Sequence, residues 1–432
     1  MKSVHLTNYY HKNSGGISTS YNNLLAAAMR HKRLIRLIVP GETEAIEEIN
    51  EFAKIYYIPA KFSPVFDKRY RIILPWQFMP TDTLIRKIIM DEMPDMIEVT
   101  DKYTLGMLGA MVRVGKFEEI NRPMLVHFSC ERMDDNIASF MSKGRLGKAL
   151  ARNVIAKYII PTYDFHIANS VYTAQEFFDS VEETGKSRLM NWTWKKFKAP
   201  NIELKERIFV CPRGVNIEQF SPDRKSSEVK KEMRKRAGIS DDAIILLYAG
   251  RVSPEKNIPL LADFMKILAR DEQHDFRLLV AGAGPLEDYL KEQATGELRD
   301  KIILLGHLDK DLLADYYANA DVFVHPNPRE PFGIAPLEAM ASGVPVVAPN
   351  AGGILSYATD ENIWMREPTG EKFAEAIKEI VENPNKTEIK IKNALQTANE
   401  NTREISTDNL LATYDKMFED FKKRRKLFTR EN

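Results

Sequence analysis

Cysteine is scarce in this sequence of 432 residues. Cys130 and Cys211 are the two cysteines, neither belongs to a CxxC motif, and no cluster of histidines lies near either one in the sequence. The sequence therefore indicates neither a disulfide framework nor a structural zinc site, and it suits a reducing compartment.

Long apolar runs are also lacking, since none approaches the roughly 20 residues that span a bilayer. The first twelve residues are mostly polar and begin like a strand, unlike a signal peptide. We therefore expect a protein that is neither secreted nor membrane-spanning. We expect it in the cytoplasm, peripheral at most on the inner face of the membrane.

A strong net charge is missing too. The formal net charge is +1, which argues against bulk nucleic acid as a partner. The charge is unevenly distributed, because Lys and Arg minus Asp and Glu gives roughly +6 for residues 1–200 and roughly −5 for the remainder. We expect the basic surface mostly on the first half of the chain.

The length exceeds the size at which a single core keeps growing, so two domains of about 200 residues each and a cleft between them are expected. A hydrophobic content of 44% and a charged content of 28% are those of an ordinary globular protein. We predict an N-terminal domain over residues 1–210, a C-terminal domain over 211–400, and a helical tail over 401–432 that packs back on the first domain.

Short apolar runs alternate with helix-length segments, most regularly after Asp241. This alternation predicts parallel strands with crossover helices, and hence a doubly wound α/β domain in the second half and a second α/β domain in the first. The runs that we expect to be strands include Leu34–Val39, Met96–Val99, Met124–Phe128, Phe165–Ala168, Ala243–Ala249, Leu278–Ala281, Val322–His325 and Val344–Val347.

Three loops that contain glycine follow expected strands, where a parallel sheet places its binding sites. Glycine lets the backbone approach a ligand, and the N–H groups at a helix start favour an anion. A tight strand-to-helix turn selects glycine as well, and no loop completes GxGxxG, which counts against a dinucleotide-binding dehydrogenase. The loops begin at Gly15-Gly16, Gly250-Arg251 and Gly282-Ala283.

Two cations, Arg251 and Lys256, lie five residues apart between a strand end and a helix start. Such a pair can hold a diphosphate, although both could also be solvated loop charges. We favour the diphosphate interpretation because of the position at the strand end.

The segment from His325 to Gly353 carries two glutamates, Glu330 and Glu338. Glu330 precedes a turn built by Pro331 and Gly333, and Glu338 falls near the start of the next helix. One carboxylate can meet a sugar hydroxyl and the other a ribose diol, while the amides of Phe332, Gly333 and Ile334 point at the donor. Alternatively, Glu338 only offsets the helix dipole and Glu330 is a surface loop residue.

The same segment closely resembles the Glu-seven-Glu signature of the family 4 (group 1) retaining glycosyltransferases. The resemblance continues, in the family's order, through LLYAGRVSPEKN, LVAGAGPLEDYL, ILLGHL and PVVAPNAGGI, with VCPRGVNIEQFSP and NYYHKNSGGIS upstream. It implies the GT-B fold, in which two doubly wound Rossmann-like domains face each other across a cleft, and a nucleotide-sugar donor.

The resemblance also implies roles for individual residues. Glu330 would bond the transferred sugar and Glu338 the ribose, while Arg251 and Lys256 would clamp the diphosphate. The remaining donor contacts would come from Gly15, Gly16, Gly250, Gly282 and the backbone around His307 and Leu308. His127, at the end of the strand MLVHF, would line the acceptor side near the anomeric carbon, although a lone strand-end histidine is otherwise usually structural.

The patch SCERMDDN, residues 129–136, is similar to that of mannosyltransferase-like members and supplies the expected acceptor-side residues Glu131, Arg132 and Asp134. Asp134 and Asp135 are adjacent acids without further ligands, so no metal site is expected, and the resemblance implies no cofactor. After Gly352-Gly353 the family usually has an acidic residue where this chain reads ILSY, which leaves one donor-side contact in doubt.

A basic helix and a tryptophan-lysine segment point toward a membrane surface. Arg145, Lys148 and Arg152 share one face of an expected helix, with Leu146, Leu150 and Val154 on another. Trp192, Trp194, Lys195, Lys196 and Lys198 follow. Tryptophan beside lysine suits a bilayer interface, although a solvated helix face and a core-packed aromatic pair would give the same pattern.

We therefore expect a retaining, metal-independent hexosyltransferase that moves a hexose, with mannose favoured, from a nucleotide diphosphate sugar to a lipid-linked or saccharide acceptor. An anionic membrane surface is an expected partner and nucleic acid is not. The alternatives are another GT-B activity, such as a nucleotide-sugar epimerase or a glycogen-type synthase, and a non-catalytic scaffold that docks at membranes.

Overall fold

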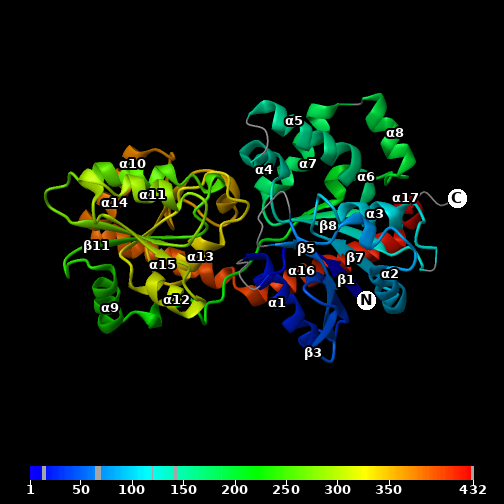
Figure 1. The fold of residues 1–432 in the computed structure, drawn as a ribbon, viewed down its shortest axis with the longest axis horizontal. Coiled ribbons are helices and arrows are strands. Elements are labelled where there is room, and N and C mark those ends of the chain that lie inside the picture. The colour runs from blue at the N-terminus through cyan, green and yellow to red at the C-terminus, as the bar shows by residue number, and fades with distance from the viewer. Residues whose placement is uncertain (12–15, 64–69, 119, 141–143, 186, 430–432) are drawn as a thin grey trace. The chain divides into compact units, whose positions relative to one another are not determined.

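The structure is a computed structural model that describes residues 1–11, 16–63, 70–118, 120–140, 144–185 and 187–429. The chain forms two compact units (Figure 1). The first contains Met1–Cys211 and Thr407–Asn432, and the second contains Pro212–Ser406.

The first unit is built on a sheet in the order β10-β9-β8-β7-β1-β2-β4-β3. Neighbouring strands are parallel, except that the edge strand β3 runs antiparallel to β4. The order reverses between β1 and β7, so the carboxyl ends of these strands form the switch point where open α/β sheets bind ligands. The strands are β1 Ser3–Leu6, β2 Ile35–Gly41, β3 Ala45–Asn50, β4 Ala53–Pro59, β7 Met96–Val99, β8 Met124–Ser129, β9 Phe165–Ala168 and β10 Ile208–Val210, with a separate hairpin of β5 Lys61–Phe62 and β6 Arg71–Ile72.

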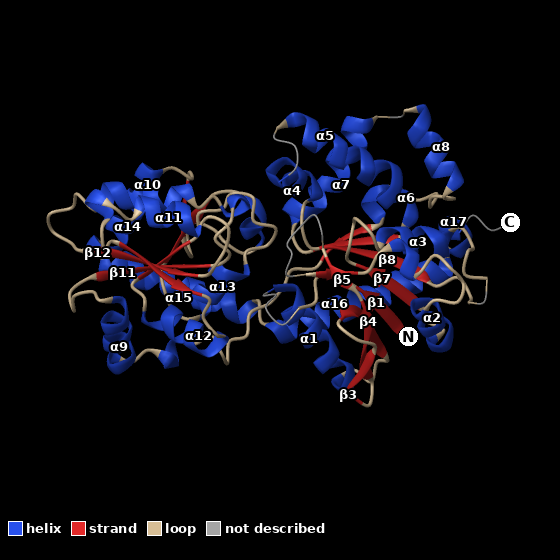
Figure 2. Ribbon diagram, viewed as in Figure 1, coloured by secondary structure: helices blue, strands red, loops and turns tan. Residues whose placement is uncertain are grey.

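Helices cover both faces of this sheet (Figure 2). Successive residues of β8 show the two faces, because Leu125 belongs to one buried cluster and Val126 to another. The helices are α1 Gly16–Arg30, α2 Leu84–Glu92, α3 Gly106–Arg113, α4 Met133–Phe140, α5 Arg145–Val154, the π-helix Ile155–Ile159, α6 Ile160–Thr162, α7 Val171–Thr184, α8 Arg188–Lys196, α16 Arg403–Lys423 and α17 Arg425–Thr429.

The C-terminal helices complete the core of the first unit. Tyr414 on α16 is buried and donates a hydrogen bond to the buried Glu98 on β7. Arg113 on α3 donates to the backbone oxygen of Phe428 at 2.7 Å, and the Phe428 ring is fully buried. Residues from the two ends of the chain therefore share one hydrophobic core.

The second unit has an all-parallel sheet in the order β13-β12-β11-β14-β15-β16, with its switch point between β11 and β14. Both units are thus doubly wound α/β domains, as the alternation of apolar runs predicted. The elements are β11 Ile244–Ala249, β12 Phe276–Ala281, β13 Ile302–Gly306, β14 Val322–Val324, β15 Val346–Pro349, β16 Trp364–Arg366, α9 Ser227–Ala237, α10 Pro259–Leu268, α11 Glu287–Gln293, α12 Lys310–Asn319, α13 Ile334–Ala341, α14 Gly370–Glu382 and α15 Pro384–Glu400.

Within the described ranges, no helix combines the length and the apolar character that crossing a bilayer would require.

Candidate active site

The carboxyl ends of the strands in the second unit carry most of the predicted donor-binding residues. Gly250 follows β11 and Gly282 follows β12, and a Cβ added at Gly282 would lie 1.8 Å from the Gly250 oxygen. Gly282 also donates its N–H to the Gly306 oxygen at 2.7 Å. Glycine at position 282 is therefore required by the close contact between neighbouring loops, independently of any role in donor binding.

Lys256 and Glu330 meet at the switch point of the second unit. Lys256 Nζ lies 2.7 Å from Glu330 Oε2, and Asn327 Nδ2 donates to the same oxygen at 3.0 Å. Burial raises the pKa of Glu330, but Lys256, His325 and Asn327 outweigh that effect and lower the pKa to about 2. Glu330 is therefore a carboxylate at neutral pH.

Two loops from neighbouring strands bring this pair together. The loop after β11 ends in the turn Pro254–Lys256, and Asn257 then donates its side-chain N–H to the Pro326 oxygen at 3.0 Å. The loop after β14 is held by the Gly353 N–H, which donates to the Glu330 backbone oxygen at 2.7 Å. Since β11 and β14 are neighbours, these contacts fix residues that are distant in sequence.

His325 is the third titratable residue of this group. Its Nε2 lies 3.7 Å from Glu330 Oε2. Burial lowers the pKa of His325 to about 4, with Lys256 lowering it further and Glu330 opposing the shift. The imidazole is therefore neutral at pH 7.

Glu338 has a different environment from Glu330. It is the fifth residue of α13, and Tyr317 donates its hydroxyl proton to Glu338 Oε2 at 3.1 Å. Burial raises the pKa of Glu338 to about 7, and the opposing effects of Tyr317 and Lys310 are smaller. The two glutamates of the signature thus differ by about five pKa units, and Glu338 changes charge near neutral pH.

Arg251 and the residues after Glu330 occupy the same end of the sheet. Arg251 Nη1 lies 3.8 Å from Glu255 Oε1, and Tyr248 donates to the Arg251 backbone oxygen at 2.8 Å. Phe332 is buried and its ring packs on Tyr357, while Gly333 and Ile334 begin α13. Neither cation of the predicted clamp is a free loop charge, because each has an acidic partner.

The predicted base-contact residues follow Gly306 at the end of β13. The His307 side chain is exposed, and Leu308 packs against the core beneath it. The structure thus places them at the carboxyl edge, on the strand that neighbours β12.

His127 lies in the interior of the first unit. Its side chain is completely buried, and its ring packs on those of Tyr163, His166 and Phe177 at centroid distances of 5.3, 5.7 and 5.9 Å. Burial, with Lys102 and His166 nearby, lowers its pKa well below the usual value. The neutral ring is part of the core, which counts against a direct contact with an acceptor.

Arg132 and Asp134 also differ from the predicted acceptor residues. Arg132 donates to both carboxylate oxygens of Asp134, at 2.9 and 2.7 Å, and Arg152 Nε donates to Asp134 at 3.0 Å. Asp134 is fully buried, and Arg132 is also paired with Asp179 on α7 at 3.0 Å. These ion pairs join α4, α5 and α7, so the charges of Arg132 and Asp134 are already satisfied within the unit.

Glu131 is the third residue predicted for the acceptor side. It is partly exposed, and its carboxylate accepts hydrogen bonds from Tyr9 at 3.2 Å and from Asn136 at 2.8 Å. Burial raises its pKa, although Lys102, Asn136 and Tyr9 oppose the shift. Asp101 lies nearby, where its Oδ1 accepts from the backbone N–H groups of Tyr103 and Thr104 in the turn before α3 and its Oδ2 accepts from Asn8 at 2.8 Å.

Tyr9 and Asp101 were not among the predicted site residues. Tyr9 follows β1 and Asp101 follows β7, so both lie at the switch point of the first sheet. Their position directly after two expected strands was the available signal. Gly16 is the first residue of α1 near the same edge, and Gly15 lies outside the described residues.

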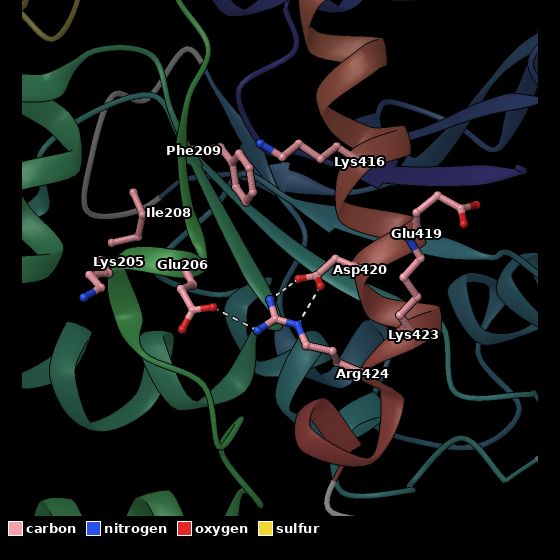
Figure 3. Close-up of a pocket in the computed structure, with 9 residues that line it drawn as sticks. All are labelled: Lys205, Glu206, Ile208, Phe209, Lys416, Glu419, Asp420, Lys423 and Arg424. Atoms are coloured by element: carbon pink, nitrogen blue, oxygen red, sulfur yellow. Dashed lines mark hydrogen bonds and ion pairs between the residues drawn. The ribbon is translucent and has the colours of Figure 1, made fainter.

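A surface pocket of about 510 Å³ lies elsewhere on the first unit (Figure 3). Lys205 and Glu206 precede β10, and Arg424 on the other wall is paired with Asp420 and, at 2.9 Å, with Glu206. The pocket thus lies at the amino end of an edge strand and contains none of the predicted site residues. In the part of the chain that the structure describes, no three His, Cys, Asp or Glu side chains form a group that could hold a metal ion.

Comparisons with known proteins agree with this architecture. Residues 229–397 match the family described as glycosyl transferases group 1. A GDP-mannose-dependent alpha-(1-6)-phosphatidylinositol dimannoside mannosyltransferase from Mycobacterium tuberculosis is 28% identical over 384 residues, which cover 89% of this chain and 88% of the relative. An alpha-monoglucosyldiacylglycerol synthase from Streptococcus pneumoniae is 28% identical over 256 residues, 59% of this chain and 51% of the relative.

The fold has solved counterparts over nearly its whole length. The sucrose-phosphate synthase of Thermosynechococcus elongatus superposes with a TM-score of 0.69 at 19% identity, covering 97% of this chain and 100% of the synthase. The likeness at this identity concerns the fold. Residues 229–397, within the second unit, thus match the group 1 glycosyl transferases, and the chain as a whole has the two-domain GT-B fold of glycosyltransferases.

Proposed function

We propose that this protein is a retaining, metal-independent mannosyltransferase of family 4, which transfers mannose from GDP-mannose to a lipid-linked acceptor at the cytoplasmic face of a membrane. The second unit binds the donor and the first unit binds the acceptor. The observation that carries the donor side is the Lys256–Glu330 pair beside Glu338 at one switch point. The relative from Mycobacterium tuberculosis, similar over 89% of the chain, supports mannose and a lipid acceptor.

On the donor, Lys256 and Arg251 face the diphosphate. Departure of this leaving group increases its negative charge, and preorganised cations stabilise such charge most effectively in the transition state. Because the amino acids supply both cations, the reaction has no need of a divalent ion for this step.

Glu330 binds the transferred sugar. Its Oε2 accepts hydrogen bonds from Lys256 and Asn327, whereas among the described residues its Oε1 accepts none. A pKa of about 2 keeps Oε1 available as an acceptor for a sugar hydroxyl throughout the physiological pH range. His325 Nε2 lies 3.7 Å from Oε2, and because the imidazole is neutral at pH 7 it does not neutralise the carboxylate.

Retention is proposed from the resemblance to family 4, and because no carboxylate among the described residues is assigned as a covalent nucleophile, the expected route is front-face attack. The acceptor hydroxyl attacks the face that the diphosphate leaves, and the departing phosphate takes the acceptor proton. Glu131, with Tyr9 and Asn136, orients the acceptor hydroxyls, since its carboxylate follows β8 and is bonded to Tyr9 at the neighbouring switch point.

The test is a product analysis with GDP-mannose and UDP-glucose, each offered with a phosphatidylinositol mannoside and with a soluble mannoside, in buffer that contains a chelator. We expect release of GDP and an alpha-linked mannosyl product without added metal. A beta-linked product contradicts retention, and loss of turnover with chelator contradicts metal independence. An epimerised donor or a glucan product would replace the proposal by another GT-B activity.

A further inference from the structure

Helix α5 has its polarity inverted. Leu146 and Leu150, one turn apart, are 81% and 58% exposed, whereas Gly147 and Ala151 face the protein. A surface helix of a globular protein normally buries its large apolar residues and exposes its charges. The two leucines of α5 instead point toward solvent, while Val154 at the end of the helix packs against the core.

Two cations of α5, Lys148 and Arg152, are held by acids of neighbouring helices, whereas Arg145 is exposed. Lys148 Nζ lies 3.0 Å from Asp135, and Arg152 pairs with Asp134 at 3.0 Å and with Asp179 at 3.3 Å. These contacts come from α4 and α7, so they fix the rotation of α5 about its own axis. The outward position of the two leucines is therefore built into the fold.

Helix α8 packs on the π-helix that continues α5 and adds further exposed apolar residues to this part of the unit. Trp194 points inward and donates its indole N–H to the Ala156 oxygen of the π-helix at 2.8 Å, which attaches α8 to the continuation of α5. Tyr158 of the π-helix is 45% exposed, and its ring packs on Phe197, directly after α8, at 6.3 Å. On α8 itself, Leu189 and Trp192 are exposed. We call Leu146, Leu150, Tyr158, Leu189 and Trp192 the α5–α8 face.

The charges that accompany this face are mostly positive. Lys196 Nζ lies 4.9 Å from the centre of the Trp192 ring. Among the described residues of α5 and α8 and the turn after α8, the exposed charged side chains are all cationic: Arg145, Arg188, Lys195, Lys196 and Lys198. The exposed acids of the neighbouring α7 are Glu182 and Glu183, and Glu183 is paired with Arg152.

We propose that the α5–α8 face docks on an anionic phospholipid bilayer, with its leucines and aromatic rings in the interface and its lysines and arginines at the headgroups. Aromatic and leucine side chains flanked by cations are suited to shallow insertion. A second copy of the chain is disfavoured as the partner, because pairing two such faces would bring cations against cations. This docking rests on the proposed function, because a lipid-linked acceptor would be reached at the bilayer surface.

The face is connected to the acceptor side of the same unit. Helix α4 begins two residues after Glu131, and its first-turn acids Asp134 and Asp135 hold α5 through the pairs described above. Figure 1 shows α4 and α5 side by side. Docking through α5 would thus keep the segment that carries Glu131 near the lipid headgroups.

Vesicle flotation of the full chain tests the proposal, with phosphatidylcholine vesicles made with and without phosphatidylglycerol. We expect binding that requires phosphatidylglycerol and that falls as salt rises. The triple variant Leu146→Ser, Leu150→Ser, Trp192→Ser should weaken binding at least about tenfold. The variant Ile46→Ser, Ile389→Ser, which alters two apolar residues that are each 62% exposed, is the matched control and should bind like wild type.

The charges are tested separately. Each lysine near an anionic surface contributes about fivefold, so Lys195→Gln, Lys196→Gln, Lys198→Gln should weaken binding about a hundredfold. The matched control, Lys231→Gln, Lys235→Gln, Lys291→Gln, removes the same charge from exposed positions of the second unit and should bind normally.

Three results would overturn the proposal: no vesicle binding by wild type, equal binding to vesicles without phosphatidylglycerol, or normal binding by both triple variants. Self-association that the leucine and tryptophan changes abolish would assign the face to a second copy instead. Turnover of a soluble mannoside by each variant is measured in parallel. If the wild-type protein does not turn over the soluble mannoside or the lipid-linked acceptor, the proposed function is contradicted, while the vesicle-binding result still tests the docking proposal.

Discussion

Lys256 Nζ and Glu330 Oε2 lie 2.7 Å apart, so the cation assigned to the diphosphate and the carboxylate assigned to the sugar are partners in one ion pair. Their side chains are 25% and 14% exposed, which makes the pair stronger than an ordinary surface contact. Substituting either residue should therefore affect both stability and transfer.

Lys256→Ala should weaken donor use and lower stability by roughly 1–3 kcal/mol, because Glu330 keeps its burial but loses the partner that lowers its pKa. The measurements are urea unfolding and calorimetric titration with GDP. Lys291→Ala, at a side chain that is 61% exposed, is the control and should change neither. Normal GDP affinity in folded Lys256→Ala would remove Lys256 from the diphosphate site.

Glu330→Gln should keep the fold and nearly normal GDP affinity while turnover falls about tenfold to a hundredfold. The amide has the same size, and a hydrogen bond to a charged group is worth about 1.5–3 kcal/mol, where about 1.4 kcal/mol corresponds to tenfold in rate. Calorimetry and turnover are measured on one preparation. Near-normal turnover would make Glu330 a loop residue only, and lost GDP binding would assign it to the nucleotide.

Glu338 should make stability depend on pH near neutrality. Its folded-state pKa of about 7 exceeds the usual value, so between about pH 4.5 and 7 the folded protein keeps a proton that the unfolded chain has lost. The stability from this group is complete below about pH 4.5 and decreases as the pH rises through 7, by up to roughly 3 kcal/mol. Glu338→Gln should be relatively more stable at pH 8 than at pH 5, as urea unfolding at both values can show. An unchanged difference between the two pH values would contradict the raised pKa.

Asp134→Asn should destabilise the protein by roughly 2–4 kcal/mol, because Arg132 and Arg152 would lose their shared buried partner. Activity per folded molecule should remain, since this carboxylate is enclosed by the two arginines. Asp288→Asn, at a side chain that is 89% exposed, is the control. A stable Asp134→Asn protein with altered acceptor KM would return Asp134 to the acceptor site.

His127→Phe should keep turnover within about threefold. In the described structure neither ring nitrogen of His127 has a hydrogen-bond partner, and the ring is surrounded by other rings, so phenylalanine loses no polar contact. The measurement is kcat with the acceptor in excess. A fall of a hundredfold or more in a stably folded variant would restore the acceptor role.

The strands of the two sheets were readable from the sequence because parallel strands are buried on both faces and read as apolar runs. Met96–Val99 and Phe165–Ala168 coincide with β7 and β9. The edge strand β3 was not predicted, since its glutamates are exposed and give it no apolar run. Its identity depends on pairing with β4, which sequence periodicity does not report.

The site was readable only in part. The glutamates and the strand-end loops could be recognised from their positions in the sequence. Lys256 and Glu330, however, are 74 positions apart, and their contact depends on β11 lying beside β14. Arg132 and Asp134 are polar residues after a strand, like true ligand contacts. Only the arrangement of α5 and α7 around them shows that their charges are already satisfied.

The two tryptophans of α8 illustrate the same limit. Their sequence context is alike, yet Trp194 bonds to the Ala156 oxygen and Trp192 is 56% exposed. Two positions on a helix differ by about 200° in direction, so the helix that packs beside them determines which one faces solvent.

Because Tyr414, Phe421 and Phe428 complete the core of the first unit, the order of synthesis and the order of folding cannot coincide. Domains commonly fold in turn as the chain leaves the ribosome. Here the early part of the first unit must wait while all of Pro212–Ser406 is translated, and the second unit, which is continuous in sequence, can finish folding before it. During synthesis, residues 1–211 would therefore expose apolar surface for longer than any other part of the chain. Such exposed surface favours aggregation or binding by a chaperone.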